Sequence, residues 1–108
     1  MKINELVQQT FVISLLEAIE RREHTKKVLA DLNLPFEFED AVQSKTYFIG
    51  CAQSHLNVLN KITTFPTLVL EDDVEPFDDN KTIPPIPSDA DIIYLKHFDI
   101  SLRHNLPP

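Results

Sequence analysis

The chain has 108 residues, a formal net charge of −7 and a sequence pI of about 4.9, which argues against a nucleic-acid binder because such a protein needs a basic face. The length predicts one domain over residues 1–108, and the single cysteine, Cys51, excludes an internal disulfide framework. The single glycine, Gly50, excludes Gly-rich dinucleotide and P-loop motifs. We expect a soluble cytoplasmic protein without a transmembrane segment, because no apolar run is long enough and no signal-peptide pattern is present.

The first half of the chain predicts a strand, a helix and a second strand. Residues 10–16, TFVISLL, are a β-rich apolar run. Ser14 and Glu17 have the S-x-x-E spacing of a capping box, which predicts a helix that extends to about Asn33. Three- and four-residue spacing predicts its inner face as Leu15, Ala18, Arg22, Thr25, Leu29 and Leu32. Apolar and acidic residues alternate over 36–42, FEFEDAV, which predicts the second strand.

The second half continues the alternation. Residues 50–63 predict a helix, and 67–70, TLVL, have the unbroken apolar run expected of a central parallel strand. The predicted apolar stripe of the helix is Ala52, His55, Leu59 and Ile62. A Pro- and Asp-rich loop is expected over 75–90, a further strand over 91–95, and a tail over 97–108. This order favours the α/β class with a mostly parallel sheet.

An acidic cluster comes directly after the TLVL run. Glu71, Asp72 and Asp73 lie at the predicted carboxyl end of that strand, which is where open α/β sheets bind ligands. Side chains two residues apart in extended chain point the same way, so Glu71 and Asp73 share one face and Asp72 points to the other. Because hard cations prefer carboxylate oxygens, Glu71 and Asp73 predict a Mn²⁺ or Mg²⁺ site. The alternative is an acidic loop that only faces water.

Five segments keep their order over roughly residues 11–96: FVISL with the downstream ERR, FEFEDAV, IGCAQSH, PTLVLEDDVEPFDD and DADIIYL. Together they resemble glycosyltransferase family 25, the lipopolysaccharide-biosynthesis glycosyltransferases. The resemblance implies a Rossmann-like, GT-A-type fold that binds a nucleotide diphosphate sugar and transfers the sugar to a saccharide acceptor. Family members are usually much longer, so the chain is incomplete relative to the family, and it offers no identifiable catalytic base.

The same resemblance implies roles for individual residues. Glu71 and Asp73 would hold the cation that bridges the diphosphate, and Asp72 would contact the ribose or the sugar. The remaining nucleotide-sugar contacts that it implies or allows are Arg21, Arg22, Gly50, Ser54 and His55.

Each of these residues also has a structural interpretation. The arginine pair can simply pair with neighbouring carboxylates on a helix surface. His55 fits a core histidine, and Ser54 fits a solvated helix position. Gly50 either relieves the backbone at a turn before the helix or permits a phosphate to approach the helix N-terminus.

Three functions are therefore open. The first is a short, metal-dependent glycosyltransferase. The second is a module that binds a nucleotide sugar or a metal without turnover. The third is a structural remnant or subunit that needs a partner, or a further copy of the chain, to complete the sheet.

Overall fold

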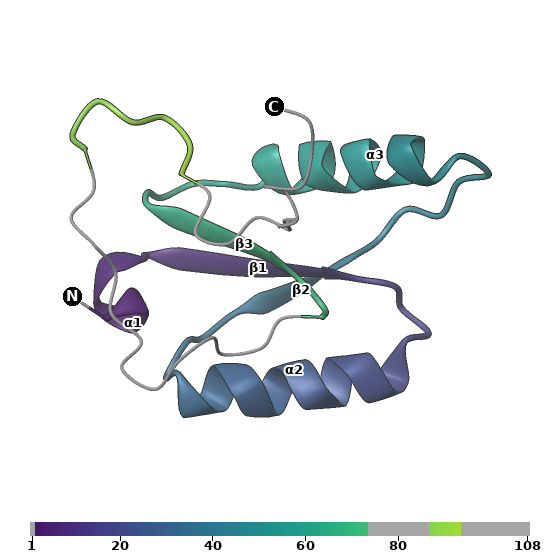
Figure 1. Cartoon of the computed structure of the whole chain (residues 1–108), viewed down its shortest axis with the longest axis horizontal. Helices are drawn as coiled ribbons and strands as arrows, with labels where there is room; N and C mark the ends of the chain where they lie inside the picture. Colours follow the sequence, from purple (N-terminus) through teal and green to yellow (C-terminus); the bar gives the residue numbers. More distant parts are fainter. Residues whose placement is uncertain (1, 74–86, 94–108) are drawn as a thin grey trace, which may run out of the picture.

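A computed structural model of the chain describes residues 2–73 and 87–93. The elements within these residues are α1 (Ile3–Leu6), β1 (Gln9–Ser14), α2 (Ile19–Asp31), β2 (Glu37–Asp40), α3 (Tyr47–Leu59) and β3 (Thr67–Glu71). The strands that the structure describes form a three-stranded, all-parallel sheet in the order β2-β1-β3 (Figure 1). The predicted α/β class is confirmed, and the arrangement is that of an incomplete Rossmann-like core.

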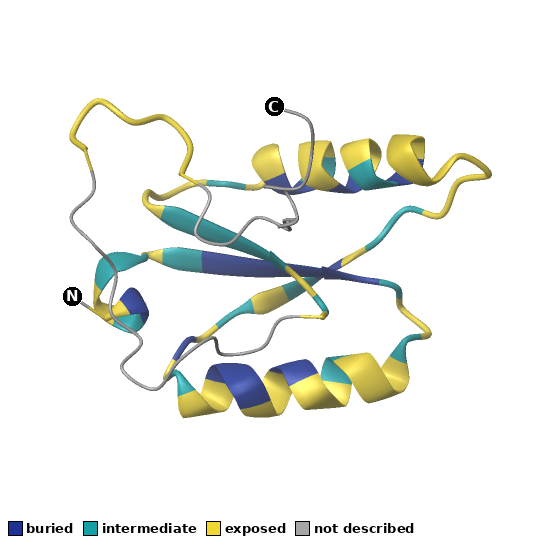
Figure 2. Ribbon diagram, viewed as in Figure 1, coloured by how far each residue is buried: buried dark blue, intermediate teal, exposed yellow. Residues whose placement is uncertain are grey.

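The two long helices cover opposite faces of this sheet, α2 on one side and α3 on the other (Figure 1). Alternation along β1 supplies both layers, because successive strand side chains point to opposite faces. Val12 packs in a cluster with Val28 and Leu29 of α2, while Phe11 and Ile13 pack with Val58 of α3. Figure 2 shows the buried residues of each helix on the side that faces the sheet.

The central strand is β1, not the TLVL strand expected from its apolar run. β1 is hydrogen-bonded to β2 and to β3, and its residues from Thr10 to Ser14 are all buried. β3 pairs with β1 alone among the described strands, and its residues 67–70 are only half-buried. Its apolar composition therefore reflects contact with the helix layers on both faces, not a central position.

The capping box predicted at Ser14 and Glu17 is wrong. Ser14 is the last residue of β1, and α2 begins five residues later, after Ala18, which provides no side-chain cap. The Ser14 hydroxyl has instead a long-range partner, described below. The predicted inner face of α2 is confirmed at the centre of the helix, since Thr25 and Leu29 are buried.

The apolar stripe predicted for α3 is also wrong. Ala52, His55 and Leu59 are exposed, and the buried residues of the helix are Gly50, Ser54 and Val58. Two small residues face inward because the loop between β2 and α3 packs directly against them, as the site geometry shows. Burial of the backbone against the helix here overrides the pattern of large apolar side chains.

The C-terminal predictions fall largely outside the described residues. Residues 91–93 form no strand, and Ile92 is exposed; the rest of the strand expected over 91–95 is not described. The tail over 97–108 and most of the loop over 75–90 are likewise not described. In the part of the chain that the structure describes, no helix is long and apolar enough to cross a bilayer.

Candidate functional site

A cavity of about 460 Å³ opens at the carboxyl ends of the strands. Its walls come from the end of β1, the β2–α3 loop, the first half of α3 and the end of β3. From β1 the chain passes through α2 to β2 on one side, and then through α3 to β3 on the other. The strand order therefore reverses between β1 and β3, and this is the position where doubly wound sheets bind their ligands.

The acidic residues that end β3 separate to opposite sides of the sheet. Leu68 and Leu70 pack in the α2-side cluster and Val69 in the α3-side cluster. Continuing this alternation, Asp72 contacts residues of α2 and Glu71 contacts α3. Both line the cavity. Asp73 follows Asp72 and is exposed.

Asp72 is held by partners from β1 and α2. Its carboxylate accepts a hydrogen bond from the Ser14 hydroxyl at 2.7 Å and one from Arg21 at 3.3 Å. Its backbone carbonyl accepts a further bond from the buried Thr25 hydroxyl at 3.3 Å. The Asp72 side chain is only 12% exposed. These contacts fix the start of the segment after β3 to the α2 side of the sheet.

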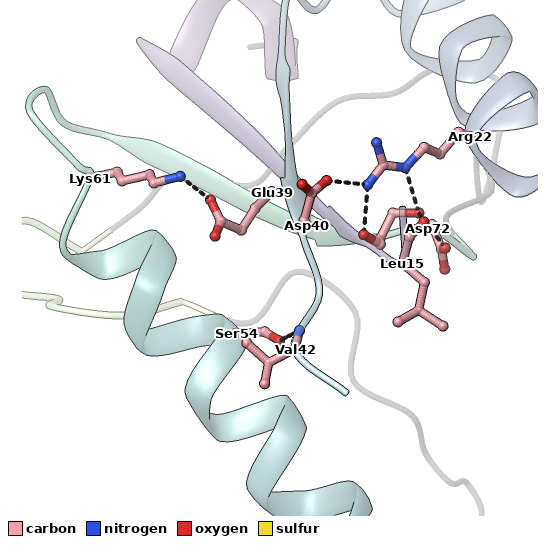
Figure 3. A network of polar contacts seen from close by, with 9 residues as sticks. Leu15, Arg22, Glu39, Asp40, Val42, Ser54, Lys61 and Asp72 are labelled. Carbon is pink, nitrogen blue, oxygen red and sulfur yellow. Dashed lines mark hydrogen bonds and ion pairs between the residues drawn. The ribbon is translucent and has the colours of Figure 1, made fainter. Parts of the chain in front are cut away.

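The two arginines have different surroundings. The Arg21 side chain is 68% exposed and lines the cavity, with Asp72 as its ion-pair partner. Arg22 is 15% exposed: its Nη2 donates at 2.8 Å to both the Ser14 carbonyl and Asp40 (Figure 3), and its guanidinium lies 4.5 Å from the centroid of the Phe38 ring. Arg22 thus joins the ends of β1 and β2 to α2. Arg22 donates to groups at the ends of β1 and β2, whereas Arg21 lines the cavity.

On the α3 side, Glu71 is more accessible. Its carboxylate lies 3.6 Å from the His55 Nε2, and the two side chains are 51% and 48% exposed. The interpretation of His55 as a core histidine is therefore wrong, because the apolar stripe assumed for it faces solvent. His55 and Glu71 lie on the same wall of the cavity.

The pKa of Tyr47, the first residue of α3, is affected by both Glu71 and Asp73. A hydrogen bond with Cys51 is the largest cause that raises the pKa of the Tyr47 phenol, followed by the charge of Cys51 and then that of Glu71. Asp73 raises this pKa as well. Both Glu71 and Asp73 therefore act electrostatically on the first residue of α3, while Asp72 is held on the α2 side.

Gly50 and Ser54 are buried where the β2–α3 loop meets α3. The Ser54 hydroxyl accepts a hydrogen bond from the Val42 amide at 2.8 Å (Figure 3) and donates one to the Gly50 carbonyl at 2.8 Å. Gly50 lies inside α3, not at a turn before it and not at the helix N-terminus. The solvated position considered for Ser54 is also wrong, because Ser54 is 1% exposed.

A hard divalent cation is compatible with the carboxylates of Glu71 and Asp73. Among residues 2–73 and 87–93, no group of three or more His, Cys, Asp and Glu side chains is arranged to hold a metal ion. Mg²⁺, however, commonly uses one or two protein carboxylates and completes its coordination with water and substrate phosphates. Glu71 and Asp73 are the two residues that would supply this smaller set, and Glu71 lines the cavity.

Several residues of the cavity wall were not singled out by the sequence. They include Gln43, Ser44, Tyr47 and Cys51. The first three lie between the predicted second strand and the next helix, and only the paired register of β1 and β2 reveals that this segment lies at the carboxyl end of the sheet. Among these four, Tyr47 could have been noticed in the sequence as a site candidate, because it is an aromatic residue between a polar segment and a helix.

The model of glycosyltransferase family 25 (LPS biosynthesis protein) matches residues 7–47. The chain is a partial match to glycosyltransferase family 25. The resemblance inferred from the sequence is confirmed over this segment, which contains β1, α2, β2 and the loop up to the start of α3. No curated protein and no solved structure gives a significant match to the chain.

The family match supports a glycosyltransferase-like function in lipopolysaccharide biosynthesis, with sugar donor and acceptor substrates. The matched segment includes Arg21 and Arg22 but ends before Gly50. The resemblance of the later segments, with the roles it implies for Ser54, His55 and the acidic cluster, stays a prediction from the sequence.

Proposed function

We propose that the chain binds a nucleotide diphosphate sugar in the cavity at the β1–β3 switch point, together with Mn²⁺ or Mg²⁺, for transfer of the sugar to a saccharide acceptor. The observation that carries this proposal is the position of the cavity. The cavity lies where a doubly wound sheet binds nucleotides. An exposed cation, Arg21, and an exposed anion, Glu71, line its opposite walls.

The residues of this cavity suit the parts of such a ligand. Arg21 presents a planar guanidinium, which matches phosphate oxygens with paired hydrogen bonds. Glu71 and Asp73 are the candidate cation ligands, and a bound cation would neutralise charge on the diphosphate. Asp72 accepts a hydrogen bond from Arg21 at 3.3 Å. We therefore propose that Asp72 orients Arg21 and does not contact the ribose.

A second candidate is a nucleotide-sugar or metal-binding protein without turnover, or a subunit of a larger assembly. It is favoured by the extent of the family match, which covers the β1-α2-β2 unit and not the acidic end of β3. In the residues that the structure describes, no side chain is identified as a catalytic base. Donor binding is common to both candidates and is therefore the property to test first.

The test measures the thermal unfolding midpoint with Mn²⁺ and each of ADP, CDP, GDP and UDP. A ligand that binds only the folded chain stabilises it by about 2.7 kcal/mol at one hundred times its Kd, which is a clear shift of the midpoint for a chain of this size. We expect at least one nucleotide to shift the midpoint only when Mn²⁺ is present.

The double variant Glu71→Ala, Asp73→Ala should lose the Mn²⁺-dependent shift. Its matched control is Asp31→Ala, Glu37→Ala, which removes two exposed carboxylates distant from the carboxyl ends of the strands and should keep the shift. If no nucleotide shifts the wild-type midpoint, donor binding is refuted. If binding occurs, nucleotide release in the presence of a nucleotide sugar and a lipopolysaccharide-type acceptor separates the enzyme from the binding module.

A further inference from the structure

We propose that Gly50 and Ser54 position the wall of the nucleotide site without contacting the nucleotide. They form a clamp that fastens the β2–α3 loop, at Val42 to Ser44, onto α3. This inference rests on the proposed function for the identity of the ligand. Its structural basis is a set of contacts that exist within the chain itself, so that it can be tested separately.

Ser54 provides the polar half of the clamp. Its hydroxyl oxygen accepts the Val42 amide hydrogen and donates its own hydrogen to the Gly50 carbonyl, both at 2.8 Å. Both bonds are internal, and the side chain is 1% exposed. A ligand would therefore have to break a buried hydrogen bond to reach this hydroxyl. Ser54 also ties the loop to α3 through a main-chain group, which makes the contact independent of the loop's side chains.

Gly50 provides the steric half. A Cβ atom built on Gly50 would lie 2.7 Å from the Val42 carbonyl oxygen and 3.4 Å from the Ser44 Cβ. The closest of these atoms belongs to the backbone, so it cannot move away as a flexible side chain would. Only glycine allows the loop to lie this close to the helix. The four-residue spacing of Gly50 and Ser54 places both on the same face of α3.

The fastened loop forms part of the cavity. Val42, Gln43 and Ser44 line it, together with Gly50 and Ser54 themselves. On the other side of the loop, the Ala41 amide donates to the Ser14 carbonyl at 2.8 Å, which continues the alignment of β1 and β2. The start of the loop is thus held from two sides, by β1 at Ala41 and by α3 at Val42. Releasing the α3 contact would change the shape of one wall and leave Arg21 and Glu71 in place.

The experiment compares wild type with Ser54→Ala and Gly50→Ala. The first readout is hydrogen exchange of the Val42 amide, which needs no ligand. The second is the Kd for the tightest of ADP, CDP, GDP and UDP with Mn²⁺, measured well below the unfolding midpoint of every variant. Gln53→Ala is the matched control, because Gln53 is an exposed neighbour on α3 whose hydrogen bond is to Asn57 on the same helix.

We expect Ser54→Ala to lose protection of the Val42 amide, with the amides of α2 unchanged. We expect both clamp variants to bind the nucleotide about tenfold more weakly, the effect of about one lost contact, and the control to bind as wild type does. A purely structural role would lower the unfolding midpoint but leave the Kd of the folded molecules unchanged. On helix propensity alone Gly50→Ala would stabilise the chain, so weaker binding with no gain in stability supports the steric half.

Two results overturn the inference. One is full protection of the Val42 amide in Ser54→Ala. The other is wild-type binding that persists unchanged in both clamp variants, which would refute the clamp and leave the proposed function standing. If wild type binds none of the four nucleotides, the proposed function fails and positioning of a nucleotide fails with it. The loop contact is then still decided by the amide protection.

Discussion

Glu71 and Asp72 are neighbours in the sequence, yet their surroundings are opposite. Asp72, on the α2 side, is held by Ser14 and Arg21 and is 12% exposed, whereas Glu71, on the α3 side, lies 3.6 Å from His55 and is about half exposed. Asp72 is thus bound internally on the α2 side, whereas Glu71 on the α3 side is presented to the cavity. A ligand-binding site needs both kinds of charged residue, because the rigidly held charges set its geometry and the accessible charges bind the ligand.

The largest effect expected from this comparison is on Arg22. Arg22→Met should destabilise the chain by about 2 kcal/mol, because it removes charged hydrogen bonds to the Ser14 carbonyl and Asp40 in a partly buried site. Arg21→Met should change the stability by less than about 0.5 kcal/mol, since the Arg21 side chain is 68% exposed. Urea unfolding of both variants measures the difference, and equal losses would contradict the assignment of Arg22 as the internal arginine.

A second, smaller contrast concerns the acidic neighbours. Asp72→Ala should cost about 1 kcal/mol, because the Ser14 hydroxyl and Arg21 lose their acceptor. Glu71→Ala should leave the stability within about 0.5 kcal/mol of wild type and remove the Mn²⁺-dependent shift. The same unfolding measurement applies, with and without Mn²⁺. A larger loss of stability for Glu71→Ala than for Asp72→Ala would reverse the comparison.

The smallest effect concerns Tyr47. The pKa of its phenol is raised above the ordinary 10.0, first by the hydrogen bond with Cys51 and then by the charges of Cys51, Glu71 and Asp73. The folded chain therefore holds this proton more tightly than the unfolded chain. The associated stability is present below the ordinary pKa and is lost as the pH rises through the folded value.

Titration by ultraviolet absorbance in a Tyr94→Phe background isolates the Tyr47 phenol, because the chain has two tyrosines. Cys51→Ala should lower its pKa the most, and Glu71→Ala, Asp73→Ala should lower it by less. An unchanged pKa in the double carboxylate variant would show that the charges of Glu71 and Asp73 do not act on Tyr47.

Much of this architecture was predictable from the sequence. The strand-helix alternation gave the α/β class, and the period of two along residues 67–72 separated Glu71 from Asp72 before any contact was known. Of the five segments that carry the family resemblance, the two that form β1, α2 and β2 lie within the confirmed residues 7–47. These features are local, so they can be recognised from neighbouring residues alone.

The sequence predictions that failed concern features that are set by long-range contacts. Ser14 fits a helix cap by local spacing, but its hydroxyl binds Asp72, 58 residues away in the sequence. The inner face of α3 was misjudged because Gly50 and Ser54 are small and polar, and their burial depends on a loop that reaches them from β2. Arg22 on an inner face was equally unexplained until Phe38 and Asp40 were found beside it.

The central place of β1 also has a kinetic consequence. Phe11 pairs with Glu37 on β2 and with Val69 on β3, so the two pairings close loops of different length. Shorter loops cost less entropy to close, and local contacts form sooner. We therefore expect the β1-α2-β2 unit to assemble first and β3 to dock last. The acidic residues that follow β3 would then reach Ser14 and Arg21 in the final step of folding, so the cavity comes into existence only when the sheet is complete.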